Sequence, residues 1–212
     1  MNFEVFLKNI EVLKNTQLPG IEAQFKLAPK MRLEYNAKRI EANNPKIAAV
    51  LALFYPNDKN TVSLLLTKRA KYNGTHSGQV SFPGGKVEKS DLNLKETALR
   101  ETFEEVGVLQ EKIDIVREIT EVYIPPSNFS VTPYIGLLNN KPLFKVNSEV
   151  AKIIEIPFSD LLDDSRLASI SITNSYMKET SVPCFNFDGS IIWGATAMIL
   201  SEIKELVKNM KP

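Results

Sequence analysis

The chain has 212 residues, which is enough for one well-buried domain with a short appendage but little for two domains. Its 43% hydrophobic and 24% charged residues are typical of a globular protein and exclude a disordered or fibrous chain. With 26 Lys and Arg against 25 Asp and Glu, the net charge is +1, so the composition predicts no general binding of nucleic acid or membranes.

Two residue types occur only once, and each excludes a kind of site. Cys184 is the only cysteine and cannot form an internal disulfide, and His76 is the only histidine, which excludes a metal site built from several imidazoles. Any metal must therefore be held mainly by oxygen. The longest apolar stretch, residues 47–55, is too short to span a bilayer, and charged Glu4 and Lys8 argue against a signal peptide. We expect a reducing compartment such as the cytoplasm.

The first 44 residues are interpreted as an N-terminal helical arm, and residues 45–212 as the main domain. Residues 3–14 have roughly helical spacing of apolar side chains, and Leu18-Pro19-Gly20 ends this run. Residues 22–44 are polar, and their pattern is ambiguous.

Beyond the arm, strands and helices are mixed without strict alternation. In chain order we expect strands over residues 47–55 and 61–68, a loop over 72–85, a helix over 94–106, strands over 113–123, 129–138 and 150–156, a hairpin over 182–187 and 191–193 around Asp188-Gly189, and a helix over 195–209. This order predicts an α/β chain of the α+β type, in which helices cover both sides of a mixed sheet.

The expected helix over 94–106 carries a cluster of acids. Glu101, Glu104 and Glu105 stand at positions i, i+3 and i+4, so their carboxylates share one helix face. Like charges at this spacing cost about 0.2–0.5 kcal/mol per pair. Such a cluster is reasonable if a hard divalent cation such as Mg²⁺ lies among the oxygens, although solvated acidic faces are also common. The tight turn Gly84-Gly85 before the helix and Gly107 at its end favour a phosphate and metal site over a random surface.

These residues resemble the Nudix box. Residues 85–108 supply its glycine, the Arg-Glu pair, the Glu-Glu pair and the closing Gly-apolar pair, with Thr102 in an apolar position. Asp91 stands where the box has its first Glu, and one extra residue separates it from Arg100. The resemblance implies a Nudix-like α/β/α sandwich with an acidic catalytic helix, comprising residues 45–212.

A second motif resembles the signature of the coenzyme A pyrophosphatase branch of the Nudix hydrolases. It consists of Leu65-Leu66-Thr67-Lys68-Arg69-Ala70, then Gly78, then Phe82-Pro83-Gly84-Gly85. Further similarity in later segments extends the resemblance over roughly residues 46–204. Where the signature has an arginine four residues after Ala70, this chain has Gly74.

The resemblance implies roles for individual residues. Glu101, Glu104 and Glu105 are the expected catalytic acids and metal ligands, joined by a backbone carbonyl at Gly85. Arg100 would orient these carboxylates by bidentate pairing. The expected contacts to substrate come from Arg69, His76, Gly84 and Gly85.

For other residues the sequence gives less support for a role in the site. Glu149, and with less support Glu121, are candidates for an additional acid, and Ser81 and Gln79 could line the site. We interpret Trp193 as a core residue and Cys184 as a buried strand residue without a nucleophilic role.

The implied activity is hydrolysis of a diphosphate that links two groups, with Mg²⁺ or Mn²⁺ as cofactor. For coenzyme A the products would be 3′,5′-ADP and 4′-phosphopantetheine. Gly74 keeps open a Nudix hydrolase of ADP-ribose, NADH or another nucleotide, and a third hypothesis is a binding module with the Nudix fold but no activity. The expected partner is a small diphosphate compound such as coenzyme A, and the sequence leaves open whether a homodimer forms.

Overall fold

The computed structural model describes residues 1–173, 179–208 and 210. Within them, eight strands form one mixed sheet whose central strand is β1 (Lys46–Pro56). β1 runs parallel to β7 (Phe129–Leu137) and antiparallel to β2 (Val62–Arg69), as the expected hairpin requires. The other strands are β3 (Val80–Ser81), β4 (Gly84–Lys86), β5 (Asp114–Glu118), β6 (Val122–Ile124) and β8 (Val150–Pro157).

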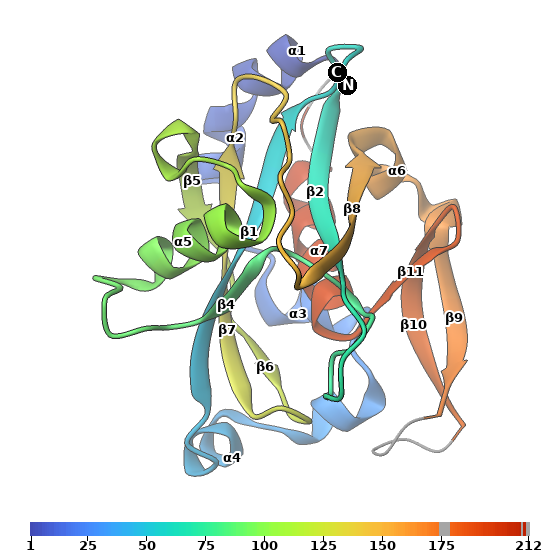
Figure 1. Ribbon diagram of the computed structural model, residues 1–212. Coiled ribbons are helices and arrows are strands. Elements are labelled where there is room, and N and C mark those ends of the chain that lie inside the picture. The colour runs from blue at the N-terminus through green and yellow to red at the C-terminus, as the bar shows by residue number, and fades with distance from the viewer. Residues whose placement is uncertain (174–178, 209, 211–212) are drawn as a thin grey trace.

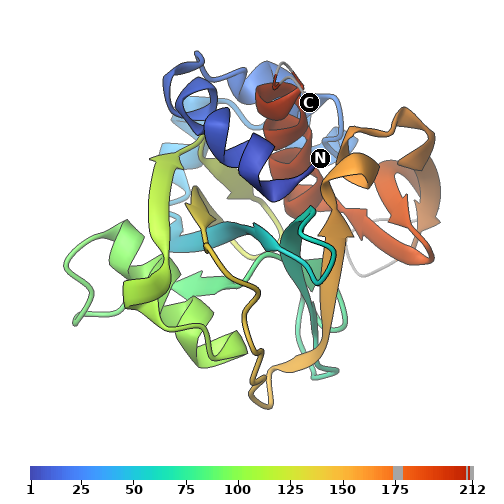
Figure 2. The same ribbon diagram turned by 90° about the horizontal axis from the view of Figure 1, so that it is seen from above.

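The alternation of side chains along β1 divides the core into two layers. Helices lie on both faces of the sheet (Figures 1 and 2). Leu51 and Leu53 pack with helix α5 (Leu94–Val106) on one face of the sheet. Phe54 packs on the other face, where helix α7 (Gly194–Val207) lies. The α/β/α sandwich expected from the sequence is therefore confirmed. The expected end of α7 at Asn209 lies outside the described residues.

A small second sheet lies beside the sandwich (Figure 1). It contains the antiparallel strands β9 (Leu167–Ile172), β10 (Thr180–Phe187) and β11 (Ser190–Trp193), after helix α6 (Phe158–Leu162) and the 3₁₀ helix η3 (Asp164–Arg166). The hairpin at Asp188-Gly189 is confirmed, with positive φ angles of 49° and 88°. β9 is not among the expected strands, because four of its six residues are exposed and it lacks the buried apolar run seen in β1 and β2.

The arm folds into short helices that pack on the sandwich. They are α1 (Phe3–Lys8), α2 (Ile10–Asn15), α3 (Gly20–Phe25), the 3₁₀ helix η1 (Lys30–Glu34) and α4 (Ala37–Ala42). The helical spacing expected over residues 3–14 is confirmed by α1 and α2, with one interruption at Asn9, whose side chain donates to the carbonyl of Val5. Phe6 is fully buried, and its ring lies 5.3 Å from that of Phe54 and 5.4 Å from that of Phe158.

A buried carboxylate ties the arm to two other elements. Glu202 of α7 accepts hydrogen bonds from the Gln24 side chain at 2.8 Å and the Thr120 hydroxyl at 2.6 Å. Thr120 lies where β5 ends and β6 has not begun, so the single strand expected over residues 113–123 is also wrong. The chain bends there to satisfy Glu202, since a buried carboxylate needs hydrogen-bond donors.

The 3₁₀ helix η2 (Gln110–Lys112) joins α5 to β5. No helix in the described part of the chain is both long and apolar enough to cross a membrane.

The burial of Phe6 generates a prediction about stability. Phe6→Ala should lower the free energy of unfolding by about 3–5 kcal/mol, because it leaves a cavity between two aromatic rings. Val12→Ala, at a side chain that is 40% exposed, is the control and should change it by less than about 0.5 kcal/mol. Urea unfolding measures both values, and equal effects would show that α1 does not contribute to the core.

Candidate active site

A turn of glycines brings β4 against helix α5. β4 pairs antiparallel with β1, so that Gly85 lies opposite Ala49. Gly84 has a φ of +147°, and a Cβ there would collide with the backbone of Ala49. A Cβ at Gly85 would collide with the carboxyl group of Glu101. Position 84 therefore requires glycine, and a side chain at position 85 would displace the Glu101 carboxyl group from its place against the turn.

Both ends of α5 are capped, and its C-terminal end lies at Gly107 as the sequence predicts. The side chain of Asn93 accepts a hydrogen bond from the backbone N–H of Glu96, and Gly107 ends the helix with a φ of +74°. Thr102, in an apolar position of the box, is buried, and its hydroxyl donates to the carbonyl of Ala98 at 2.7 Å. This bond explains how a polar residue fits there.

Glu105 is the most buried acid of the helix. Its side chain is only 4% exposed, and its Oε2 atom has no hydrogen-bond partner. Arg69 Nη1 lies 3.6 Å from the other carboxylate oxygen. Burial raises the pKa of Glu105 to about 8, against a smaller opposing effect of the Arg69 charge. An ionised carboxylate with an unpartnered buried oxygen is a position where a cation would be stabilised.

Glu101 and Glu104 differ in their surroundings. Glu101 lies against Gly85, and burial raises its pKa above the ordinary value. The Glu104 side chain is 51% exposed and turned toward Arg100, whose Nη1 lies 3.3 Å away. Within the described residues, no three acidic, His or Cys side chains form a ready metal cage. The convergence of all three carboxylates expected from helical spacing is thus incomplete.

Arg100 pairs bidentately, but with Asp91 rather than with the box glutamates. Its Nε donates to Asp91 Oδ1 at 2.9 Å and its Nη2 to Asp91 Oδ2 at 3.0 Å. These bonds hold the pKa of Asp91 well below its usual range. Arg100 also donates to Glu101 at 3.1 Å, so it orients that carboxylate while it closes the loop before the helix. The residue that replaces the first Glu of the box therefore has a clear structural role.

Arg69 and Glu149 lie beside the acids of α5, Arg69 at the end of β2 and Glu149 just before β8. Arg69, at the end of β2, lies between Glu105 and Glu149, with its Nη2 3.4 Å from Glu149 Oε2. The Glu149 side chain is 62% exposed, so it remains accessible to water. Glu121 is exposed and does not line the cavity described next, which favours Glu149 as an additional acid.

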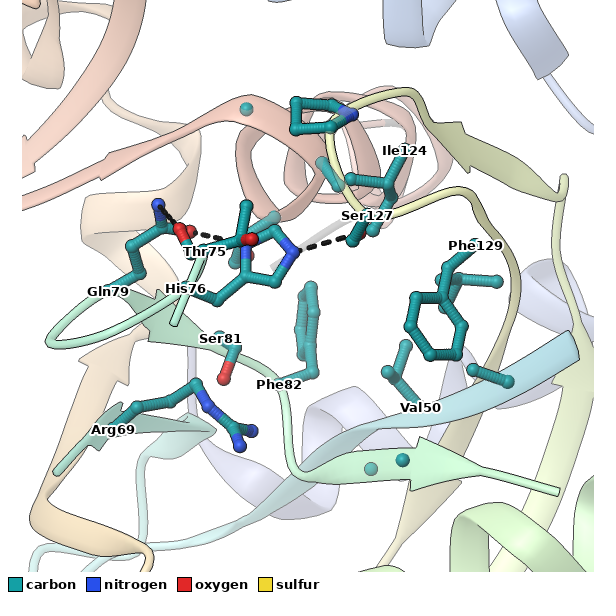
Figure 3. Close-up of a pocket in the computed structure, with 18 of the residues that line it drawn as sticks. Val50, Arg69, Thr75, His76, Gln79, Ser81, Phe82, Ile124, Ser127 and Phe129 are labelled. Carbon is teal, nitrogen blue, oxygen red and sulfur yellow. Dashed lines mark hydrogen bonds between the residues drawn. The ribbon is translucent and has the colours of Figure 1, made fainter. Parts of the chain in front are cut away.

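A cavity of about 540 Å³ joins these residues to the loop over residues 72–85, called the Gly-rich loop below. Figure 3 shows Val50 and Phe129 on one side of it and His76, Gln79 and Ser81 on the other, with Phe82 between them. The cavity is lined by the expected catalytic, metal-binding and substrate-binding residues and by Glu149, namely Arg69, His76, Gly84, Gly85, Glu101, Glu104, Glu105 and Glu149. Its mix of apolar walls and convergent charges is typical of a small-molecule site.

Both ring nitrogens of His76 are engaged. Nδ1 lies 3.0 Å from Gln79 Oε1 and Nε2 lies 2.9 Å from the hydroxyl of Ser127 (Figure 3). His76 thereby bridges the Gly-rich loop to the turn after β6. It lines the cavity, and in this geometry its bonds position the loop.

Several cavity residues were not predicted from the sequence. Pro29, Met31 and Arg32 enter from the arm, and Tyr123 enters from β6. Trp193, interpreted as core, is only partly buried and lines the cavity, so that expectation is wrong. Cys184 is buried and unpaired, as predicted.

Comparison with known proteins identifies the family. Residues 45–168 match the NUDIX domain. The chain belongs to the Nudix family. The protein is therefore a Nudix hydrolase, a pyrophosphohydrolase of the class that acts on nucleoside diphosphate-linked compounds. Members of this family generally need divalent cations.

Two curated relatives and one solved structure show the extent of this similarity. "Uncharacterized Nudix hydrolase NudL" of Photorhabdus laumondii is 32% identical over 172 residues, covering 81% of this chain and 89% of the relative. The protein of the same name from Yersinia pestis is 35% identical over 146 residues, covering 68% and 72%. The crystal structure of the Nudix hydrolase RenU from M. smegmatis is similar to this structure with a TM-score of 0.55 at 16% identity. The similarity covers 79% of this chain and 89% of the RenU chain, and it supports the fold.

The pKa of Glu105 generates a prediction about stability and pH. Because its pKa rises from 4.5 to about 8 on folding, the folded protein holds a proton that the unfolded chain releases between these values. The stability of the cation-free protein should therefore fall as the pH rises from about 5 to 8. Glu105→Gln removes this loss, so its Tm should exceed that of the parent at about pH 8.5 and approach it near pH 5. Each kcal/mol of difference in the free energy of unfolding should shift the Tm by about 2–4 °C.

Thermal unfolding in the presence of a chelator measures this difference. The control is Glu96→Gln, on the same helix but outside the cavity. A Tm difference for Glu105→Gln that does not grow with pH would contradict the assigned shift.

Proposed function

We propose that the protein hydrolyses coenzyme A or its derivatives to 3′,5′-ADP and 4′-phosphopantetheine, with Mg²⁺ or Mn²⁺ as cofactor. The observation that carries this proposal is the buried carboxylate of Glu105, whose Oε2 has no partner, beside Glu101 and the glycine turn. The match of Arg69, Gly78 and Phe82-Pro83-Gly84-Gly85 to the coenzyme A pyrophosphatase signature supports the choice of substrate.

The donor set fits a hard divalent cation. Carboxylate oxygens of Glu101 and Glu105, with Glu104 and the carbonyl of Gly85, would hold it, since Mg²⁺ and Mn²⁺ prefer oxygen. When bound, the cation supplies positive charge that neutralises diphosphate oxygens and polarises water. Glu104 needs only a rotation of its exposed side chain away from Arg100 to take part.

The chain's own residues bind and orient the substrate. The guanidinium of Arg69 lies at the cavity wall among Glu105 and Glu149 and can donate to a diphosphate oxygen. Arg100 holds Glu101 in place through its fixed pairing with Asp91. Glu149, exposed at the same wall, is our candidate for accepting the proton of the attacking water.

The alternative substrates are ADP-ribose, NADH or another nucleotide, and the observation that favours them is Gly74. A Cβ at this position would collide with the ring of Tyr72, so the place of the signature arginine is filled by an aromatic ring at the cavity wall. The retained carboxylates argue against an inactive binding module. A reducing location such as the cytoplasm is part of the proposal, because Cys184 is unpaired.

Product analysis tests the proposal. The protein is incubated with coenzyme A, ADP-ribose or NADH and with Mg²⁺ or Mn²⁺ at moderately alkaline pH, and the products are identified by chromatography and mass spectrometry. Coenzyme A should give 3′,5′-ADP and 4′-phosphopantetheine. Equal or faster turnover of ADP-ribose would reject coenzyme A as the preferred substrate.

The role of Glu105 is tested in the same assay. Glu105→Gln should lower kcat/KM by about 10²–10³-fold, because a catalytic cation supplies several kcal/mol of transition-state stabilisation. Glu96→Gln is the matched control and should stay within about twofold of the parent. Full activity of Glu105→Gln would exclude a cation held by this residue.

A further inference from the structure

Arg32 places a buried positive charge at the wall of the cavity. It lies in η1 of the arm, is only 4% exposed, and lines the cavity together with its neighbours Pro29 and Met31. This segment is far in sequence from the Nudix box, and the box resemblance assigns it no role.

The guanidinium of Arg32 is incompletely satisfied. Nη1 donates to the carbonyl of Tyr35 at 3.0 Å, but Nε is buried without a hydrogen-bond partner. Among the described residues no carboxylate lies within 4.0 Å of it. The rings of Phe25 and Tyr123 lie 5.3 Å and 5.8 Å from its central carbon and offset part of the burial. A buried charge without a counter-ion is otherwise costly.

The cavity therefore has two electrostatically different ends. At one end, Arg69 already lies between two carboxyl groups, those of Glu105 and Glu149. At the arm, Arg32 has no acidic partner, and burial lowers its pKa, as expected for a cation that lacks one. If the diphosphate of a substrate lies at the acidic helix, only a second anionic group of that substrate can serve as the counter-ion of Arg32.

We propose that Arg32 binds a phosphate monoester that the substrate carries outside its diphosphate linkage, and so determines specificity. The planar guanidinium offers two donors that match phosphate oxygens. This inference rests on the proposed function, because it requires the substrate to extend from the acidic helix to the arm. In coenzyme A the group is the 3′-phosphate.

Paired substrates that differ by one phosphate test the proposal. Arg32→Met and Arg32→Gln are compared with the parent on coenzyme A against 3′-dephospho-coenzyme A, and on NADPH against NADH. In the pair that the parent hydrolyses, both variants should lower kcat/KM for the substrate with the additional phosphate, coenzyme A or NADPH, by about ten- to hundredfold. For the substrate without it, kcat/KM should fall less than about threefold. Arg32→Lys, which keeps the charge but not the planar fork, should show a smaller loss of the same selectivity.

The matched control is Arg39→Met. Arg39 lies in the same arm, stacks on Tyr35 at 4.1 Å and is exposed outside the cavity. Its kcat/KM ratio between paired substrates should equal that of the parent. Tm values of all variants separate loss of fold from loss of selectivity, and Arg32→Lys retains most of the packing if the other two variants do not fold.

A binding measurement decides the matter without turnover. By calorimetry, 3′,5′-ADP should bind the parent more tightly than 5′-AMP does, and Arg32→Met or Arg32→Lys should reduce this preference. Equal losses for both members of a pair, or an unchanged preference, would overturn the role of Arg32 while leaving the proposed function intact. If the parent hydrolyses none of these substrates, the proposed function fails. The preference for 3′,5′-ADP over 5′-AMP then tests by itself whether Arg32 binds the additional phosphate.

Discussion

The site depends on the close approach of β4 to helix α5. Because β4 pairs with β1, the backbone at Gly84 and Gly85 lies where side chains would collide with β1 on one side and with Glu101 on the other. The approach shields the neighbouring carboxylates from water, and this burial raises the pKa values of Glu101 and Glu105. The same geometry that gives the acids an affinity for a cation therefore makes them destabilising without one.

Two arginines limit that destabilisation in different ways. Arg100 is fixed by Asp91 and by the carbonyl of Lys86, so it provides a permanent positive charge beside Glu101. Arg69 is held less tightly, at 3.4–3.6 Å from its two carboxylates. A cation among the acids would weaken the hold on Arg69 more than the hold on Arg100. Arg69 is thus the arginine that can change partners when a substrate binds.

The sequence predicted the elements with strong periodicity. Strands β1 and β2 are continuous apolar runs, and α5 has clear capping residues, so their positions follow from local physics. The strand β4 could not be predicted in this way, because two glycines carry no hydrophobic pattern and pair only through the backbone. Asn9 and Thr120 interrupt expected elements through contacts with other groups, which periodicity does not contain.

For the site, the motif located the acids and the glycine turn but not their environment. Helical spacing places Glu101, Glu104 and Glu105 on one face, yet it cannot show that Glu104 turns to Arg100 while Glu105 is buried. Arg32 was missed for a related reason. It lies in a polar segment without periodicity, and only the folding of the arm against β6 brings it to the cavity.

The attachment of the arm then determines where selectivity can reside. Glu202 is fully buried and accepts hydrogen bonds from Gln24 of the arm and Thr120 before β6, so the arm and that side of the cavity share one anchor. Beyond this anchor, the guanidinium of Arg32 stacks on Tyr123 of β6. A buried network of this kind is rigid, because breaking any bond leaves an unpaired polar group. The box acids can thus serve diphosphates in general, while a preorganised charge on the arm distinguishes among them.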